Sequence, residues 1–299
     1  MRLPLRYLLA ATVALGGCRT TPEAPTTPEA PATSEAPTTK PRVDCGPAIP
    51  GMEAVLKPSA FVVLGEIHGT QEAPAFATRL ACHAASTGQP VRLALELPVE
   101  EQPRLDAWLA KQDGDARELT DSAFWRREVQ DGRSSEAMKQ LLVRVRDWRH
   151  AGLPLQVLAF DPGGKERDTT MADQLLKARS EARADTFIVL VGNLHARRDV
   201  GAPWNPSLEF MTHRLLQAEP GLVALDIAPE GGSAWICRGM TADTCGQQSL
   251  RSRGAAQPPG ISLQKSADAP DRYDGSYSVG ALSASPPALG ASTATPAPR

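Results

Sequence analysis

The sequence predicts an α/β fold with a mainly parallel central sheet and helices on both faces. Short apolar runs next to a glycine, such as residues 61–64 and 187–191, are typical of strands buried on both faces of a parallel sheet. Segments with an apolar stripe at helical spacing alternate with these runs along the chain. We therefore expect a single α/β domain over residues 44–287.

Each element follows from this alternation of patterns. Strands are predicted at residues 61–64, 91–97, 155–160, 187–191 and 222–227. Helices are predicted at residues 72–86, 99–111, 134–151, 170–184 and 205–218, with a short aromatic segment at 122–130. After Ala228 the pattern changes, and it predicts a hairpin at 231–246, a loop at 251–269 and a last strand at the sheet edge at 273–279.

The N-terminus is typical of an exported protein. Arg2 and Arg6 precede an apolar stretch, residues 7–15, that is too short to span a membrane and has the length of a signal-peptide core. Small residues then lead to Cys18, an arrangement that resembles the bacterial lipobox, in which the cysteine is lipidated and begins the mature chain. The alternative is an ordinary secretory signal in which Cys18 is incidental. We expect a lipoprotein signal peptide over residues 1–17 and lipidation of Cys18.

Low-complexity sequence flanks the predicted domain on both sides. Residues 20–25 and 26–31 repeat the letters TTPEAP, and residues 18–43 as a whole predict an extended tether rich in Thr, Pro and Glu. The residue after the lipobox cysteine is Arg19, not the aspartate associated with retention in the inner membrane. The predicted location is thus the bacterial envelope, anchored in the outer membrane. Residues 288–299 predict a disordered tail.

The net charge argues against one class of partner, and the spacing of the cysteines suggests two disulfide bonds. The formal net charge is −2 with no basic patch, so nucleic acid is not an expected partner. In an exported chain Cys237 and Cys245 are expected to close a hairpin-sized loop, which leaves Cys45 and Cys82 as the other pair. The alternative for Cys82 is a buried free thiol on a helix.

Two Gly-x-x-His sequences follow predicted strands, at residues 65–68 and 192–195. In an open α/β sheet ligands bind at the carboxyl ends of the strands, where His68 and His195 should lie. Glu96 and Asp161 end two other predicted strands, and Glu66 precedes His68 by two residues. The pattern predicts a site built from two imidazoles and several carboxylates.

These motifs resemble those of known families. Residues 65–72, which read GEIHGTQE, resemble the Gly-Glu-x-His-Gly-Thr-x-Glu signature of erythromycin esterase-like proteins, which usually have an additional residue before the histidine. Gly-Glu-x-His also resembles the opening motif of ChaN-like haem-binding lipoproteins. The paired motifs resemble TraB/Tiki proteins, some of which are membrane-anchored metalloproteases. The resemblance covers residues 61–195 and includes Glu96, Asp161, the segment opening at Arg167, and His195.

The residue types predict hydrolysis without a covalent intermediate. His68, with a pKa near neutrality, would act as the general base, and Glu66 or Glu96 would orient its ring. His195 would polarise a carbonyl or protonate the leaving group, and Arg167 would hold a carboxylate or an oxyanion. No Gly-x-Ser-x-Gly is present, which disfavours a serine nucleophile. The expected substrate is a small ester, lactone or peptide.

Three alternatives stay open at this stage. His68, Glu96 and His195 could hold a divalent metal of the zinc or manganese type. The ChaN-like resemblance implies haem or iron capture without catalysis, although the three tyrosines offer no ligand placed near His68 by any motif. The third alternative is a degenerate member of the group that only scaffolds other envelope proteins. A lone histidine after a strand is, in general, more often a hydrogen-bonding loop residue than a catalyst.

Overall fold

The computed structural model describes residues 43–228, 230–252 and 255–290. The predicted signal peptide, Cys18 and the tether up to residue 42 lie outside the described residues, as do residues 291–299 of the predicted tail. The strands are β1 (Phe61–Glu66), β2 (Val91–Pro98), β3 (Leu155–Asp161), β4 (Thr186–Gly192), β5 (Val200–Ala202), β6 (Asn205–Glu209), β7 (Val223–Ile227), β8 (Gly232–Cys237), β9 (Cys245–Leu250), β10 (Gly260–Ser262) and β11 (Gly275–Ser278). The α-helices are α1 (Met52–Val55), α2 (Glu72–Ser86), α3 (Gln102–Leu109), α4 (Ala116–Leu119), α5 (Ala123–Arg126), α6 (Glu136–His150), α7 (Arg167–Glu181) and α8 (Met211–Ala218), with short 3₁₀ turns at Val99–Glu101 and Ala242–Thr244.

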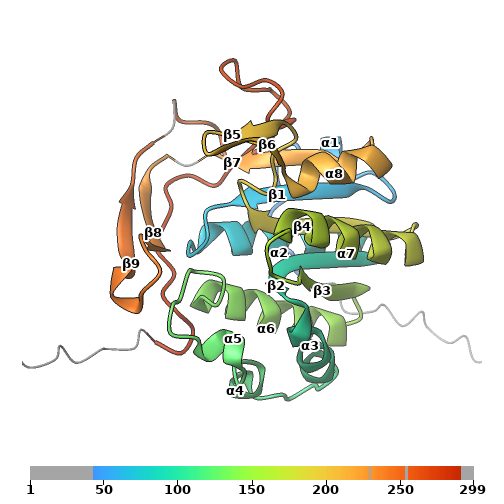
Figure 1. The fold of residues 1–299 in the computed structure, drawn as a ribbon. Coiled ribbons are helices and arrows are strands. Elements are labelled where there is room, and N and C mark those ends of the chain that lie inside the picture. The colour runs from blue at the N-terminus through green and yellow to red at the C-terminus, as the bar shows by residue number, and fades with distance from the viewer. Residues whose placement is uncertain (1–42, 229, 253–254, 291–299) are drawn as a thin grey trace, which may run out of the picture. The chain divides into compact units, whose positions relative to one another are not determined.

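Seven strands form the central sheet, in the order β10-β11-β7-β1-β4-β2-β3 (Figure 1). Every pairing is parallel except that of the edge strand β10 with β11. The predicted α/β class is confirmed, and β1, β4 and β2 are neighbours at the centre. The two Gly-x-x-His motifs therefore leave adjacent strands at the same edge of the sheet.

The sheet is buried on both faces because successive residues of its central strands enter two different hydrophobic cores. Val62 and Leu64 of β1 belong to the core shared with α2 and α6, whereas Phe61 and Val63 belong to the core shared with α7 and α8. Strand β4 alternates in the same way. This explains why continuous apolar runs, and not alternating ones, marked these strands in the sequence.

Two of the helices lie where the sequence predicted them, and a third is shorter than predicted. Helix α2 has the predicted bounds, and α6 begins after Ser135, whose Oγ accepts a hydrogen bond from the backbone N of Met138 at 3.3 Å. The predicted helix over 205–218 is wrong in its first part, because residues 205–209 form β6. There the Asn205 side chain accepts a hydrogen bond from the backbone N of Ser207 at 3.2 Å, an Asx contact that competes with helix, and the segment pairs with β5.

Other boundaries differ by less. The aromatic segment at 122–130 holds only the single turn α5, and α7 begins at Arg167 and ends at Glu181. The hairpin β8–β9 extends to Leu250, and the predicted loop at 251–269 contains β10. Strand β10 pairs antiparallel with β11 and takes the sheet edge, so the expected antiparallel edge strand is present as β10, while the segment predicted for the edge forms β11, one position inside it.

Both expected disulfides are present. Cys45 is bonded to Cys82 of α2 with their Cα atoms 5.6 Å apart, and Cys237 is bonded to Cys245 at the loop end of hairpin β8–β9. Cys82 is therefore not a free thiol. Within the described ranges, no helix is long and apolar enough to cross a membrane.

Candidate functional site

The two Gly-x-x-His motifs pack directly against each other, and this contact explains their glycines. A Cβ on Gly65 would lie 3.0 Å from the Cα of Asn193 and from the Cβ of Ala196. A Cβ on Gly192 would lie 2.9 Å from Nε2 of His68. Each glycine thus leaves space for the other motif, and the carboxyl ends of β1 and β4 can approach closely.

His68 lies between two buried carboxylates. Its Nδ1 is 3.0 Å from Oε1 of Glu66 and its Nε2 is 3.4 Å from Oε2 of Glu96, while both glutamates are only 3% exposed. Burial by itself lowers the pKa of His68, but the charge of Glu96 and the hydrogen bonds to both carboxylates outweigh it and raise the pKa to about 10. The raised pKa favours the imidazolium form of His68 at neutral pH, which suits a proton donor better than the general base predicted at this position.

Glu96 connects the other groups of the site. Its Oε2 accepts a hydrogen bond from the backbone N of Gly192 at 2.6 Å, and its Oε1 accepts one from Arg167. Burial opposes ionisation of this carboxyl, but the charge of His68, its hydrogen bond and the charge of Arg167 hold the pKa of Glu96 well below the ordinary value. Glu96 is thus an anion that joins both histidine motifs to Arg167.

His195 has a different pair of neighbours. Its Nδ1 lies 2.8 Å from Oδ1 of Asp168, and its Nε2 lies 3.2 Å from Nη1 of Arg167. Because a guanidinium can only donate, Nε2 must be the acceptor, and the ring proton must be on Nδ1 and donated to Asp168. Asp168 also accepts a hydrogen bond from the backbone N of Met211 at 2.7 Å, which fixes it at the start of α8. The geometry places the ring proton of His195 on Nδ1 and leaves Nε2 as the acceptor.

Asp161 holds two arginines at the end of β3. Its carboxylate accepts hydrogen bonds from Arg167 at 2.9 and 2.7 Å and from Arg133 at 2.8 Å. Burial opposes the ionisation of Asp161, but its hydrogen bonds with Arg167 and the charges of both arginines outweigh it and lower its pKa. The six site residues predicted from the sequence, namely Glu66, His68, Glu96, Asp161, Arg167 and His195, therefore form one connected network.

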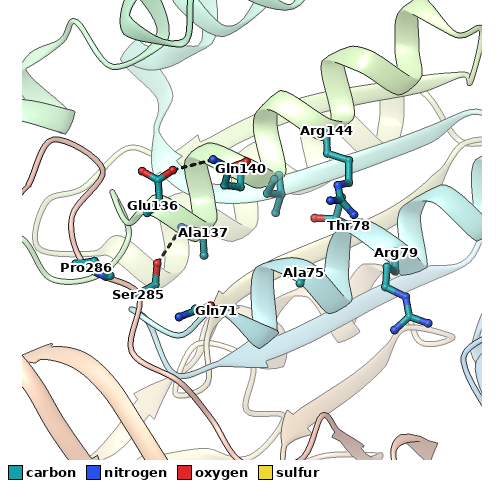
Figure 2. Close-up of a pocket in the computed structure, with 11 residues that line it drawn as sticks. Gln71, Ala75, Thr78, Arg79, Glu136, Ala137, Gln140, Arg144, Ser285 and Pro286 are labelled. Carbon is teal, nitrogen blue, oxygen red and sulfur yellow. Dashed lines mark hydrogen bonds between the residues drawn. The ribbon is translucent and has the colours of Figure 1, made fainter. Parts of the chain in front are cut away.

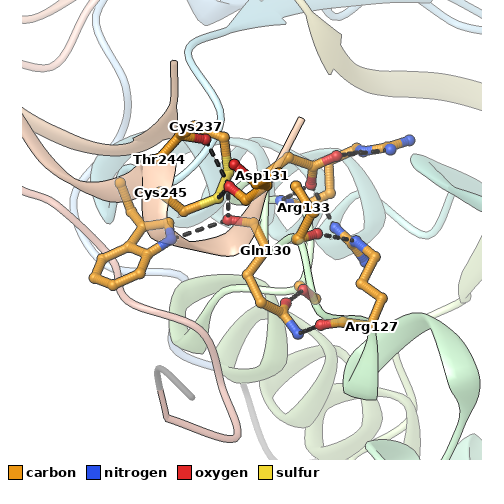
Figure 3. The surroundings of a disulfide bond; sticks show 11 residues. Arg127, Gln130, Asp131, Arg133, Cys237, Thr244 and Cys245 are labelled. Atoms are coloured by element: carbon orange, nitrogen blue, oxygen red, sulfur yellow. Dashed lines mark hydrogen bonds and ion pairs between the residues drawn. A yellow bond between two sulfur atoms is a disulfide. The ribbon is translucent and has the colours of Figure 1, made fainter. Parts of the chain in front are cut away.

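A second layer of residues positions this network from outside (Figure 3). Asp131 accepts hydrogen bonds from Arg133 at 2.8 and 3.0 Å and from Arg127. The carbonyl of Gln130, in the same loop, accepts a hydrogen bond from the Trp235 indole at 2.9 Å and lies 3.2 Å from Sγ of Cys237. The disulfide-closed hairpin β8–β9 thus packs on the loop that carries Arg133.

The backbone after His68 is enclosed by three distant segments. Gly132 has φ +94°, and a Cβ there would lie 2.7 Å from the Cα of Gly69. The carbonyl of Gly69 accepts hydrogen bonds from the backbone N of Trp235 at 2.9 Å and of Ser285 at 2.8 Å. The loop at 130–133, the hairpin β8–β9 and the C-terminal segment therefore all fix the position of His68.

Two tyrosines bind the backbone of the Gly-x-x-His motifs. The Tyr277 hydroxyl donates to the carbonyl of Gly65 at 3.0 Å, and the Tyr273 hydroxyl donates to the carbonyl of Asn193 at 2.7 Å. Burial raises the pKa of Tyr277 well above the ordinary value. Both tyrosines therefore lie beside the Gly-x-x-His motifs, although no sequence motif placed them there. Their hydroxyls hold the backbone carbonyls of Gly65 and Asn193 in position.

His68, Glu96 and His195, the ligands of the alternative metal site, do come together, but Arg167 donates to both Glu96 and Nε2 of His195. A permanent cation bound to two of the three candidate ligands does not fit a divalent ion. Among the residues that the structure describes, no group of three or more His, Cys, Asp or Glu side chains is arranged to hold a metal.

Sequence reasoning missed Asp168, Asp131 and Arg133. Asp168 follows Arg167 directly, in the segment that carries part of the family resemblance, and it lies two residues before the predicted helix, in the first turn of the observed α7. Asp131 and Arg133 flank Gly132 in a segment without helical or strand periodicity. No pattern in the sequence could therefore indicate that their side chains point toward the site.

A separate groove of about 310 Å³ lies between α2 and α6 (Figure 2). None of the predicted site residues lines it. Ser285 and Pro286 of the C-terminal segment form one end of this groove. The same segment accepts hydrogen bonds from backbone N–H groups at the starts of α6 and α2. The backbone N of Glu136 donates to Pro286 O at 2.8 Å, and the backbone N of Gln71 donates to Ser283 O at 2.9 Å.

Comparison with known proteins gives a fold and no family. No protein family profile and no curated protein sequence matches this chain. Among solved structures, a mutant of erythromycin esterase EreC in its open conformation is similar with a TM-score of 0.58 and 9% identity, over 77% of this chain and 92% of that one. A succinoglycan biosynthesis protein is similar with a TM-score of 0.57 and 10% identity, over 78% of this chain and 91% of that one.

The chain thus has an α/β fold of the kind found in an erythromycin esterase. At this level of identity the likeness concerns the fold alone.

Proposed function

We propose that this protein is a hydrolase that cleaves an ester, lactone or peptide bond with water activated by His195. The observation that carries the proposal is the Asp168–His195 pair, in which Nδ1 is bound to a carboxylate and the basic Nε2 lies beside Arg167. This is the arrangement that orients a general base and stabilises the imidazolium that it becomes.

The surrounding cations supply the other two requirements of acyl transfer. Arg167, at Nη1 beside His195, is placed to bind the oxyanion of a tetrahedral intermediate. His68 keeps its proton at neutral pH because its pKa is raised to about 10 by Glu96 and Glu66, yet it is acidic enough to protonate a departing alkoxide. The base and acid roles predicted for the two histidines are therefore exchanged in this proposal.

The proton balance closes without a covalent enzyme intermediate. Arg167 first moves its N–H from Nε2 of His195 to the substrate carbonyl oxygen, which frees the Nε2 lone pair. Nε2 then takes a proton from water as the new C–O bond forms, and the oxyanion collapses and breaks the bond to the leaving group. That group takes the proton of His68. Transfer of the proton from His195 back to His68, through solvent, restores the starting state. The fold shared with an enzyme named as an esterase makes an ester or lactone the first substrate class to test.

We also propose that the protein acts in the bacterial envelope, anchored to the outer membrane through a lipid on Cys18. The proposal is supported by the lipobox-like sequence before Cys18. It is further supported by the disulfides Cys45–Cys82 and Cys237–Cys245, since such bonds persist in oxidising compartments.

The test is hydrolysis of a panel of esters, lactones and peptides by the wild-type chain, His195→Ala and His68→Ala. His150→Ala is the matched control, because His150 is an exposed residue at the end of α6. We expect turnover in the wild type and in the control and strong loss in the two site variants, with and without a chelator. If both site variants retain wild-type turnover, the proposal is wrong. If the chelator abolishes turnover, the reaction depends on a metal, and the metal-free mechanism is wrong.

A further inference from the structure

The hairpin β5–β6 presents apolar side chains to solvent. Trp204, between the two strands, is 67% exposed, and Val200 at the start of β5 is 45% exposed. Strand β6 is exposed along most of its length. Trp204, at the tip of the hairpin, is therefore accessible for contact with another surface.

The distribution of charge along this hairpin is uneven. Residues 200–208 contain no charged side chain. At its base, by contrast, Arg197 pairs with Asp199 at 2.6 Å and Arg198 pairs with Asp274 at 2.8 Å. An uncharged apolar tip above a charged base is the pattern of a loop that enters an apolar phase while its base stays in water.

The base is fastened to the body of the protein, so that the tip is held outward. The Arg197 guanidinium lies 4.4 Å from the centre of the Phe210 ring and donates to the carbonyl of Gly201 at 3.0 Å. The carbonyl of Arg198 lies 2.8 Å from Nδ1 of His213 in α8. Pro203 and Pro206 flank the tip on either side of Trp204 and limit its freedom.

We propose that the tip of hairpin β5–β6, centred on Trp204, is a contact site for a lipid bilayer. Tryptophan favours the membrane–water interface, because its ring is apolar while its N–H can bond to headgroups. The uncharged stretch at 200–208 removes the cost of bringing ions into that region. The connection from β4 to β5 spans only residues 193–199, so this contact would bring His195 close to the membrane surface.

Fluorescence offers a direct test. All five tryptophans lie in the part of the chain that the structure describes, and of these only Trp204 is classed as exposed; Trp108 and Trp125 are 2% and 1% exposed. The chain from residue 18 onward, with Cys18→Ser to exclude lipidation, is mixed with phosphatidylcholine vesicles. We expect a blue shift of tryptophan emission, quenching by doxyl-labelled lipid, and partition about tenfold weaker in Trp204→Ser.

Two further variants make the result decisive. Trp204→Phe should retain most of the partition while losing the fluorescence response, since the ring is kept. Met240→Ser removes a residue that is 90% exposed on the other hairpin, between Arg238 and Asp243, and should partition like the parent chain. The proposal is overturned if the parent chain shows neither shift nor quenching, if Met240→Ser is weakened as much as Trp204→Ser, or if binding needs anionic lipid and persists in Trp204→Ser.

Discussion

The motifs at residues 65–68 and 192–195 have the same glycine and histidine spacing and leave adjacent strands, yet they present different chemistry. His68 lies between Glu66 and Glu96, which raise its pKa to about 10. His195 lies between Asp168 and Arg167 and accepts a hydrogen bond at Nε2. The comparison shows that the motif fixes where an imidazole lies, whereas its tertiary neighbours decide whether it holds or takes a proton.

The largest expected effect tests the base in the second motif. His195→Ala should lower kcat by about a thousandfold, because the group that takes the proton from water is lost. Asp168→Asn should cause a smaller loss, since the ring remains but its tautomer is no longer fixed. Steady-state kinetics on any hydrolysed substrate measures both. Equal activity of Asp168→Asn and wild type would break the assignment of His195 as the oriented base.

The next effect tests the acid in the first motif. His68→Gln should lower kcat by about a hundredfold at neutral pH. In the wild type the activity should fall as the pH rises toward 10, because the raised pKa of His68 marks the loss of its proton. A profile of kcat from pH 6 to pH 11 checks this. If the alkaline fall is unchanged in His68→Gln, another group causes it and the comparison fails.

A third variant removes the negative charge of Glu96, which sets the pKa of His68 apart from its ordinary value. Glu96→Gln should move the pKa of His68 from about 10 toward its ordinary 6.5, since the largest opposing charge is removed. We expect a loss of activity of about tenfold at neutral pH, because His68 is then partly deprotonated. Titration of the His68 ring protons by NMR gives the shift, and His150 serves as the internal reference.

The same pKa predicts how stability depends on pH. Because the folded state binds the His68 proton more tightly than the unfolded chain does, this stabilisation is complete below about pH 6.5 and is lost as the pH rises through 10. Urea unfolding at pH 6, 8 and 10 should show a smaller decrease in Glu96→Gln than in the wild type. A decrease of equal size in both proteins would contradict the role given to Glu96.

The smallest expected effect concerns the support of the first motif. Replacing Cys237 and Cys245 by serine should lower activity severalfold, because hairpin β8–β9 contacts both Gly69 and the loop that carries Arg133. Replacing Cys45 and Cys82 should destabilise the protein more, since that bond closes a longer loop of chain, while activity at low temperature changes less. Equal effects of the two pairs on activity would exclude a positioning role for the hairpin.

Most of the fold could be predicted because its signals are local. The apolar runs of β1 and β4 and the apolar stripe of α2 are periodic patterns, and each element formed where its pattern lies. The error at residues 205–209 arose because an Asn-Pro pair opened a strand instead of a helix, and only pairing with β5 stabilises that choice. Similarly, β10 has three residues, too few to show a pattern.

The sequence by itself determined the α/β class and the group of residues at the sheet edge, because strand ends and glycines are local features that parallel pairing brings together. Only the tertiary structure decided the protonation of His68 and the orientation of His195. Those depend on Glu96, Asp168 and Arg167, which approach from other strands and helices. Charge interactions act over ångströms in space and leave no periodic trace along the chain, so folding had to bring these groups together before their chemistry could be assigned.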